Sequence, residues 1–206
     1  MERLDNLVNQ PKTKRGEATL ERILATAEQN FFEKGYHGTS IVDITQSADI
    51  ALGTFYIYFK DKESLYRYLL TTYSHDIRKA ISVATEHCTT RRERERLGLK
   101  TFLEYIRDNK HVYNIIWEAL YIDKTLFDDY YMNFARRYIV GIEDAQVKGE
   151  IYSDLDPEIV SYFLMGVSNF IGLRYVMFDD RNQNFDWVVD QVMKLLDRSM
   201  FVEDKK

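Results

Sequence analysis

The side chains best suited to chemistry lie close together between Thr39 and Phe59, and they are suited to binding rather than to bond breaking. One short segment offers small, apolar and hydroxyl-bearing side chains: Leu52, Gly53, Thr54, Tyr56 and Tyr58. A glycine lets the backbone approach a ligand closely, and leucine or threonine methyl groups can contact the methyl group of thymine. Tyrosine hydroxyls can donate to phosphate oxygens. The segment therefore predicts contact with the major groove of duplex DNA, which admits a short helix of this kind.

Two short helices joined by a tight turn would position these residues. Ser40 followed by Asp43 is a Ser-x-x-Asp variant of the capping box, which predicts the start of the first helix. Apolar residues then recur at helical spacing. Asp49 is the expected turn residue, because aspartate tolerates the left-handed backbone conformation that the elbow needs. We expect the second helix to open at Ala51.

A longer ordered block surrounds this segment. It comprises a helix predicted over Thr19–Lys34 and then, in order, Gly35-Tyr36, Thr39-Ser40, Ile44-x-x-x-Ala48, Gly53-Thr54-Phe55-Tyr56-x-Tyr58-Phe59 and Lys60-Asp61-Lys62-Glu63-Ser64-Leu65. In this order the block resembles the DNA-binding part of the tetracycline-repressor (TetR) family of transcriptional regulators. The rest of the chain resembles that family only in helical pattern and length. Asp49 stands where the family usually has glycine, and Leu52 where a polar or basic residue is common, which concerns base preference rather than fold.

The resemblance implies a ligand-responsive, sequence-specific regulator that binds a palindromic operator in double-stranded DNA as a homodimer, acting as a repressor released by a small, largely apolar effector. The DNA contacts it implies are Thr39, Ser40, Leu52, Gly53, Thr54, Tyr56, Tyr58 and Lys62. Hydroxyl and N–H groups at a helix start suit phosphate, and Lys62 lies in the first turn of the next helix. Phe55 and Phe59 are expected to be core anchors. Effector binding would tilt that next helix and change a recognition-helix spacing of about 34–36 Å.

The middle of the chain is rich in aromatic residues, most of which fit an ordinary core by their helical spacing. The density of tyrosine is unusual for a sealed interior, because each buried hydroxyl needs a partner. The resemblance implies a ligand cavity in this region. The candidates for its lining are Phe102, Tyr105, Trp117, Tyr131, Phe134, Phe163, Asn169, Phe170 and Arg174.

The chain is predicted to be all-α, with about nine helices: an N-terminal helix-turn-helix unit of three helices and a C-terminal ligand-binding and dimerisation bundle. The expected divisions are a flexible arm at 1–16, a DNA-binding domain at 17–78 and an effector and dimerisation domain at 79–206. The helix expected over Glu158–Met177 is apolar on more than one face and contains small residues, which suits a subunit interface. With the last helix it could form half of a four-helix bundle between two protomers; a purely internal core helix is the alternative.

The net charge of −5 is unfavourable for DNA binding, but its distribution matters. Residues 1–79 hold eleven basic and eleven acidic residues, so the whole acidic excess lies in residues 80–206. Lys12, Lys14 and Arg15 form a small basic arm that could reach phosphates, although a solvated tail is an equal alternative. The tract Arg91–Arg96 alternates in sign, which favours a solvated helix start over nucleic-acid contact.

Other function classes find little support in the sequence. The four histidines lack metal-ligand spacing, and no phosphate-binding loop, nucleophile elbow or dinucleotide fingerprint occurs, so neither an enzyme nor a metal or cofactor is expected. A single cysteine, Cys88, excludes an intramolecular disulfide. The N-terminus lacks an apolar signal core, so a soluble, cytoplasmic protein is expected. An effector-independent architectural DNA-binding protein and a transcriptional activator stay open as alternatives.

Overall fold

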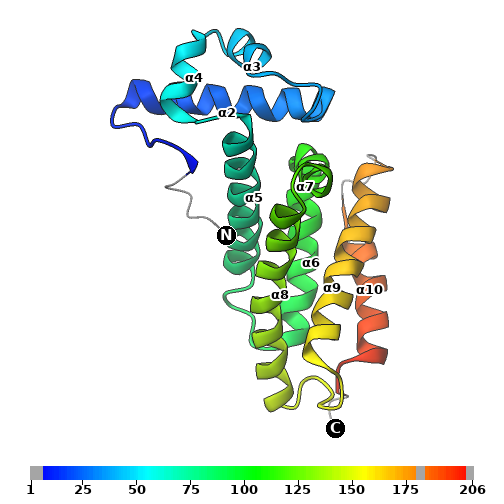
Figure 1. Cartoon of the computed structure of the whole chain (residues 1–206). Coiled ribbons are helices and arrows are strands. Elements are labelled where there is room, and N and C mark those ends of the chain that lie inside the picture. Colours follow the sequence, from blue (N-terminus) through cyan, green and yellow to red (C-terminus); the bar gives the residue numbers. More distant parts are fainter. Residues whose placement is uncertain (1–6, 180–183, 203–206) are drawn as a thin grey trace. The chain divides into compact units, whose positions relative to one another are not determined.

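The computed structural model describes residues 7–179 and 184–202 of the chain. Over these ranges the protein is built from helices (Figure 1): α2 (Lys14–Lys34), α3 (Ile41–Ser47), α4 (Leu52–Tyr58), α5 (Lys62–Ala84), α6 (Arg91–Asp108), α7 (His111–Ile122), α8 (Lys124–Val147), α9 (Pro157–Gly172), the π-helical η1 (Leu173–Met177) and α10 (Asp186–Ser199). The described residues contain only an isolated antiparallel bridge, between Ile151 and Phe201, in place of a sheet. The prediction of an all-α fold with nine α-helices is confirmed for the part that the structure describes.

The chain forms two compact units. The first comprises Met1–His75 and His111–Tyr130, and the second comprises Asp76–Lys110 and Tyr131–Lys206. The first unit thus includes α7 and the start of α8 as well as the helix-turn-helix. The functional boundary at 78 and 79 remains a prediction.

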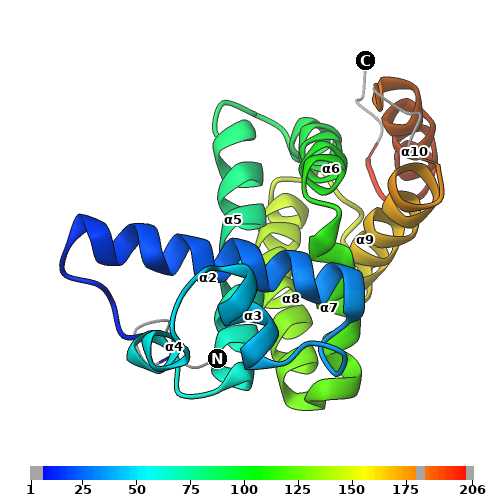
Figure 2. The same ribbon diagram turned by 90° about the horizontal axis from the view of Figure 1, so that it is seen from above.

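In the first unit, α3 packs on α2 and α4 packs on α3 (Figure 2). The Ser40 side chain accepts from the Asp43 N–H, and the Asp43 carboxylate accepts from the Ser40 N–H, so the predicted capping box is confirmed. Asp49 has a φ of 51°, which confirms it as the turn residue. Phe55 and Phe59 are completely buried, as expected of core anchors.

The predicted N-terminal arm needs correction where the structure describes it. α2 begins at Lys14 rather than Thr19, because the Thr13 side chain accepts from the Gly16 N–H and caps the helix. Leu7 and Val8 are buried. The side-chain amide and backbone N–H of Asn9 donate to carbonyls at the end of α4, each at 2.9 Å. Residues 7–9 are therefore held by the fold and α2 already begins at Lys14, although residues 12–15 are exposed. Residues 1–6 of the expected arm lie outside the described ranges.

In the second unit, α6 packs against α9, η1 and α10. The predicted solvated start of α6 is only partly right. Its basic side chains form ion pairs at 2.6 Å with acidic residues of α10: Arg92 with Asp197, Arg96 with Asp190 and Lys100 with Asp186. The basic residues of this tract are thus largely neutralised within the fold.

The helical segment Pro157–Met177 presents an apolar surface. By length and composition alone it could cross a membrane, although only a third of its most apolar window is buried. Exposed apolar side chains on α9 recur at helical spacing, at Ile159, Phe163 and Phe170 (69%, 51% and 67% exposed). On α10, Trp187 and Leu195 are exposed as well. These five residues are called the α9–α10 stripe below.

Candidate nucleic-acid interface

The exposed face of α4 is mostly apolar. Leu52, Tyr56 and Ile57 are 46%, 50% and 61% exposed, and Thr54 is half-buried. No atom lies within 4 Å of the position that a Cβ on Gly53 would take, so this glycine leaves open space at the surface. Four of the predicted contacts, at Leu52, Gly53, Thr54 and Tyr56, therefore lie on or beside one accessible face. Ile57 was missed, because the pattern of the segment does not show which of its aromatic and aliphatic residues point inward.

For two of the predicted DNA contacts, Thr39 and Tyr58, the side chain is buried and therefore does not reach the surface. Thr39 is 1% exposed, and its hydroxyl donates to the carbonyls of Asn30 and Gly35 at the end of α2. Tyr58 is buried, and its hydroxyl donates to the Gly16 carbonyl at 3.1 Å. Each hydroxyl is thus used to fasten the helix-turn-helix to α2, which is a tertiary arrangement that the local sequence does not reveal.

The predicted contacts Ser40 and Lys62 are also engaged within the unit. Ser40 is exposed, but its hydroxyl donates to Asp43 at 2.5 Å within the capping box. The Lys62 ammonium donates to the carbonyls of Tyr36 and Thr39, at 2.6 Å each, and lies 4.0 Å from the centre of the Tyr36 ring. Burial lowers the pKa of Lys62 below its usual value, although Glu118 opposes this. Lys62 therefore closes the loop between α2 and α3, and its phosphate contact stays a prediction.

Cations on α2 are available where Lys62 is not. Lys14, Arg15 and Arg22 are exposed, and within the described ranges none of their side chains forms an ion pair or hydrogen bond. Arg15 and Arg22 line an open cleft together with Thr19, Asp49 and Thr54. Arg22 was missed by sequence reasoning, although the spacing of Arg15, Thr19 and Arg22 places all three on one face of a helix.

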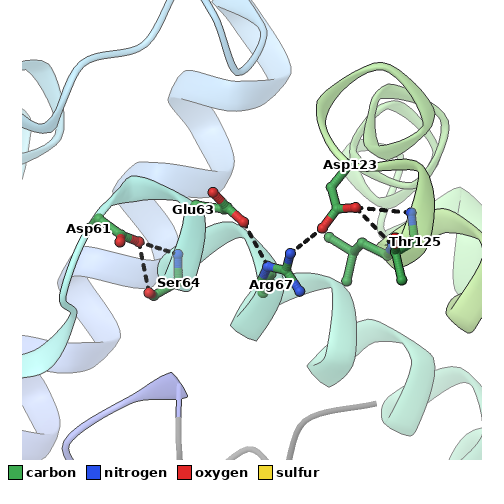
Figure 3. Close-up of polar contacts among 7 residues, drawn as sticks. Asp61, Glu63, Ser64, Arg67, Asp123 and Thr125 are labelled. Carbon is green, nitrogen blue, oxygen red and sulfur yellow. Dashed lines mark hydrogen bonds and ion pairs between the residues drawn. The ribbon is translucent and has the colours of Figure 1, made fainter.

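A polar cluster joins the start of α5 to the start of α8 within the first unit (Figure 3). Asp61 accepts from the N–H and hydroxyl of Ser64, at 2.7 Å each, and so caps α5. Arg67 pairs with Glu63 at 2.9 Å and also with Asp123. Asp123 accepts from the N–H of Thr125 as well. The cluster ties the start of α5 to the start of α8. Because α5 directly follows α4 in the chain, these contacts help to position α4.

α7 is fastened to the loop that leads into α3. Glu118 accepts from the Tyr36 N–H at 2.7 Å. The Tyr66 hydroxyl donates to the Ile115 carbonyl, and burial raises the pKa of this hydroxyl. The ring of Tyr36 packs edge-on against that of Tyr66. This docking of α7 was not foreseen, because the residues in contact are 82 and 49 positions apart in sequence.

The predicted effector residues fall into two groups. Phe102, Tyr105, Tyr131 and Phe134 are half-buried in the second unit, and Trp117 is half-buried in the first. Burial raises the pKa of Tyr131 to about 12. Asn169 is half-buried, and its side-chain amide donates to the Met165 carbonyl. The remaining three are corrected, because Phe163, Phe170 and Arg174 lie on the exposed surface of the chain rather than around an interior cavity.

Comparison with known proteins agrees with this geometry. The sequence pattern described as "Bacterial regulatory proteins, tetR family" matches residues 23–69, which run from α2 into α5. A protein of Bacillus subtilis (strain 168) named "Probable HTH-type transcriptional regulator YttP" is 28% identical over 111 residues, which are 53% of this chain and 54% of that protein. The match thus spans about half the length of this relative.

Solved structures resemble the chain over most of its length. A transcriptional regulator from Aquifex aeolicus VF5 is 27% identical with a TM-score of 0.71, and the likeness covers 86% of this chain and 99% of that one. The fatty acid degradation regulator FadR from Bacillus halodurans has a TM-score of 0.77 at 19% identity, covering 91% and 96%, which shows the fold alone. These proteins are described as regulators and not as enzymes. Residues 23–69 thus carry the pattern of the tetR family of bacterial regulatory proteins, and the comparisons together support a transcriptional regulator of that family.

Proposed function

We propose that the protein is a sequence-specific transcription regulator that binds a palindromic operator as a homodimer, with α4 of each protomer in the major groove. The observations that carry this proposal are the exposed face of α4 and the exposed cations of α2, which form no ion pair within the described ranges and line a cleft with Thr54 of α4. Arg15 and Arg22 can neutralise phosphates while the short helix approaches the base edges. They also supply local positive charge for DNA binding on a chain whose net charge is −5.

The α9–α10 stripe supports the homodimer. Large exposed apolar side chains on α9 and α10 are unfavourable in water. Burial of this stripe against the same stripe of a second copy would stabilise the dimer by about 25 cal/mol for each Å² of apolar surface removed from water. A twofold axis then forms a four-helix bundle from two helices of each protomer. Binding to successive turns of the duplex requires the two copies of α4 to lie about 34–36 Å apart in the dimer.

The proposed regulation is release of the operator by a small, largely apolar effector, with the protein acting as a repressor in the cytoplasm. The half-buried aromatic residues Phe102, Tyr105, Tyr131 and Phe134 support an apolar ligand. Two structures of the same fold are described as regulators of fatty acid degradation and of ketosteroids. Relatives named as a repressor (DhaR) and as an activator (FasR) both occur, so the sign of regulation is a separate outcome of the test.

Selection of bound duplexes from a random pool, followed by titration at several salt concentrations, tests the DNA-binding proposal. We expect enrichment of an inverted repeat, two protomers per duplex and an affinity that falls steeply with salt. A reporter fused to the selected site then gives the sign of regulation. Failure to enrich any sequence would overturn the proposal.

A further inference from the structure

We infer that α4 recognises its site mainly through the methyl groups of thymine, so that each operator half-site is thymine-rich at the contacted positions. This inference rests on the proposed DNA binding and adds the chemistry of base recognition. The sequence of α4, Leu-Gly-Thr-Phe-Tyr-Ile-Tyr, contains no arginine, lysine, asparagine, glutamine or carboxylate. Those are the side chains that form bidentate or direct hydrogen bonds with guanine, adenine and cytosine edges.

The accessible groups of α4 match a methyl group better than a hydrogen-bonding edge. Leu52 and Tyr56 are four residues apart, and Gly53 and Ile57 are offset by one, so the four form one continuous patch on a helix. Three of them present exposed apolar carbon atoms, and the open space at Gly53 lets the helix come close to its partner. The thymine C5-methyl is the one apolar group that base edges display in the major groove.

Hydrogen-bonding groups around the patch are few. Tyr58 is buried and its hydroxyl is used within the fold, which leaves Thr54 and Tyr56 as the hydroxyls of α4. Gln46 is exposed but belongs to α3, and the first helix of such a unit crosses the sugar–phosphate backbone. Apolar contact therefore supplies most of the discrimination that α4 can provide.

Charge identifies the occupant of the patch as nucleic acid rather than an apolar protein. The cleft beside Thr54 is lined by Arg15 and Arg22 of α2, whose guanidinium groups are unpaired within the described ranges. The apolar patch and these cations lie on different sides of α4 in the same unit, since Thr54 and Tyr58 are the α4 residues of the cleft. Together they fit a partner that combines methyl groups with a polyanionic backbone. Thymine-rich duplex has both properties.

Duplexes that contain deoxyuridine in place of thymidine test the inference, because they lack only the methyl group and keep all base-pair hydrogen bonds. A selected duplex is prepared with thymidine throughout, with deoxyuridine in the half-sites, and with deoxyuridine only in the flanks. We expect half-site deoxyuridine to weaken binding on the order of 4-fold for each contacted methyl. Deoxyuridine in the flanks should leave the affinity unchanged.

Variants assign the effect to α4. The double variant Leu52→Ala/Ile57→Ala changes exposed side chains, and we expect it to bind the thymidine and half-site deoxyuridine duplexes equally. Val140→Ala, which shortens an exposed aliphatic residue of α8, is the matched control and should discriminate as the unchanged protein does. Circular dichroism checks that each variant is folded.

The possible results distinguish failure of thymine-methyl recognition from failure of the proposed DNA binding. Selective binding that is insensitive to half-site deoxyuridine overturns the methyl-recognition inference alone. Discrimination that persists in the double variant overturns the assignment to Leu52 and Ile57. Loss of self-association in the double variant, with DNA binding intact, would show that the patch faces protein instead. Absence of any selective DNA binding overturns the proposed function as well.

Discussion

Lys62 and Arg22 are both cations of the first unit, yet their surroundings give them different tasks. The Lys62 ammonium donates to two carbonyls of the loop between α2 and α3, whereas the Arg22 guanidinium is unpaired within the described ranges. A charged donor that replaces water at two backbone acceptors stabilises the fold. An exposed cation beside α4 instead contributes to phosphate binding.

Substitution of the two cations should therefore separate stability from DNA affinity. Lys62→Met removes the ammonium that donates to the partly buried carbonyls of Tyr36 and Thr39, although the Tyr36 carbonyl keeps the N–H of Thr39 as a donor. We expect the variant to lower the free energy of unfolding by about 1 kcal/mol. Arg22→Ala should leave stability nearly unchanged and reduce the salt slope of DNA binding by about one unit. Urea denaturation and salt-dependent titration measure the two effects. A reduced salt slope in Lys62→Met would restore Lys62 as a phosphate contact.

At the scale of elements, the junction between α2 and α7 determines how the helix-turn-helix is held. Gly35 ends α2 with φ 72° and ψ 170°, a region that is essentially restricted to glycine. A Cβ there would also lie 2.8 Å from Oε1 of Glu118 on α7, the atom that accepts from the Tyr36 N–H. The loop thus needs glycine for two independent reasons, backbone conformation and the close approach of α7.

Gly35→Ala should lower the free energy of unfolding by about 2–3 kcal/mol through both effects. In a Glu118→Ala background the same substitution should cost less, because only the backbone strain remains. Gly149→Ala is the matched control, since Gly149 has φ 75° and no atom within 4 Å of a Cβ. Denaturant titration of the four variants and the unchanged protein measures the coupling. Equal costs of Gly35→Ala in both backgrounds would show that Glu118 does not crowd the loop.

At the scale of the whole molecule, the α9–α10 stripe is the surface that a second copy would cover. Phe163 and Phe170 were predicted to line an effector cavity, but they project outward from α9. The prediction of a subunit interface on α9 and the prediction of a cavity used some of the same residues, and the exposure of these two phenylalanines favours the interface.

Phe163→Glu should prevent self-association without unfolding the chain. At a twofold interface each substitution acts on both protomers, and burial of an unpaired carboxylate is strongly unfavourable. We expect the dissociation constant of the dimer to rise on the order of 100-fold or more, with a parallel loss of operator affinity. Val140→Glu, on an exposed site of α8, is the control. Analytical ultracentrifugation distinguishes the states, and an unchanged dimer would exclude this part of α9 from the interface.

The sequence by itself determined the features that depend on neighbouring residues. The capping box of Ser40 and Asp43, the left-handed turn at Asp49 and the anchors Phe55 and Phe59 follow from local backbone chemistry and helical spacing, and all were predicted. Only the tertiary structure decided which polar groups remain available. Thr39 and Tyr58 use their hydroxyls on carbonyls of α2, and Lys62 donates to carbonyls of the loop between α2 and α3, because buried polar groups need partners and the fold decides which partners lie within reach.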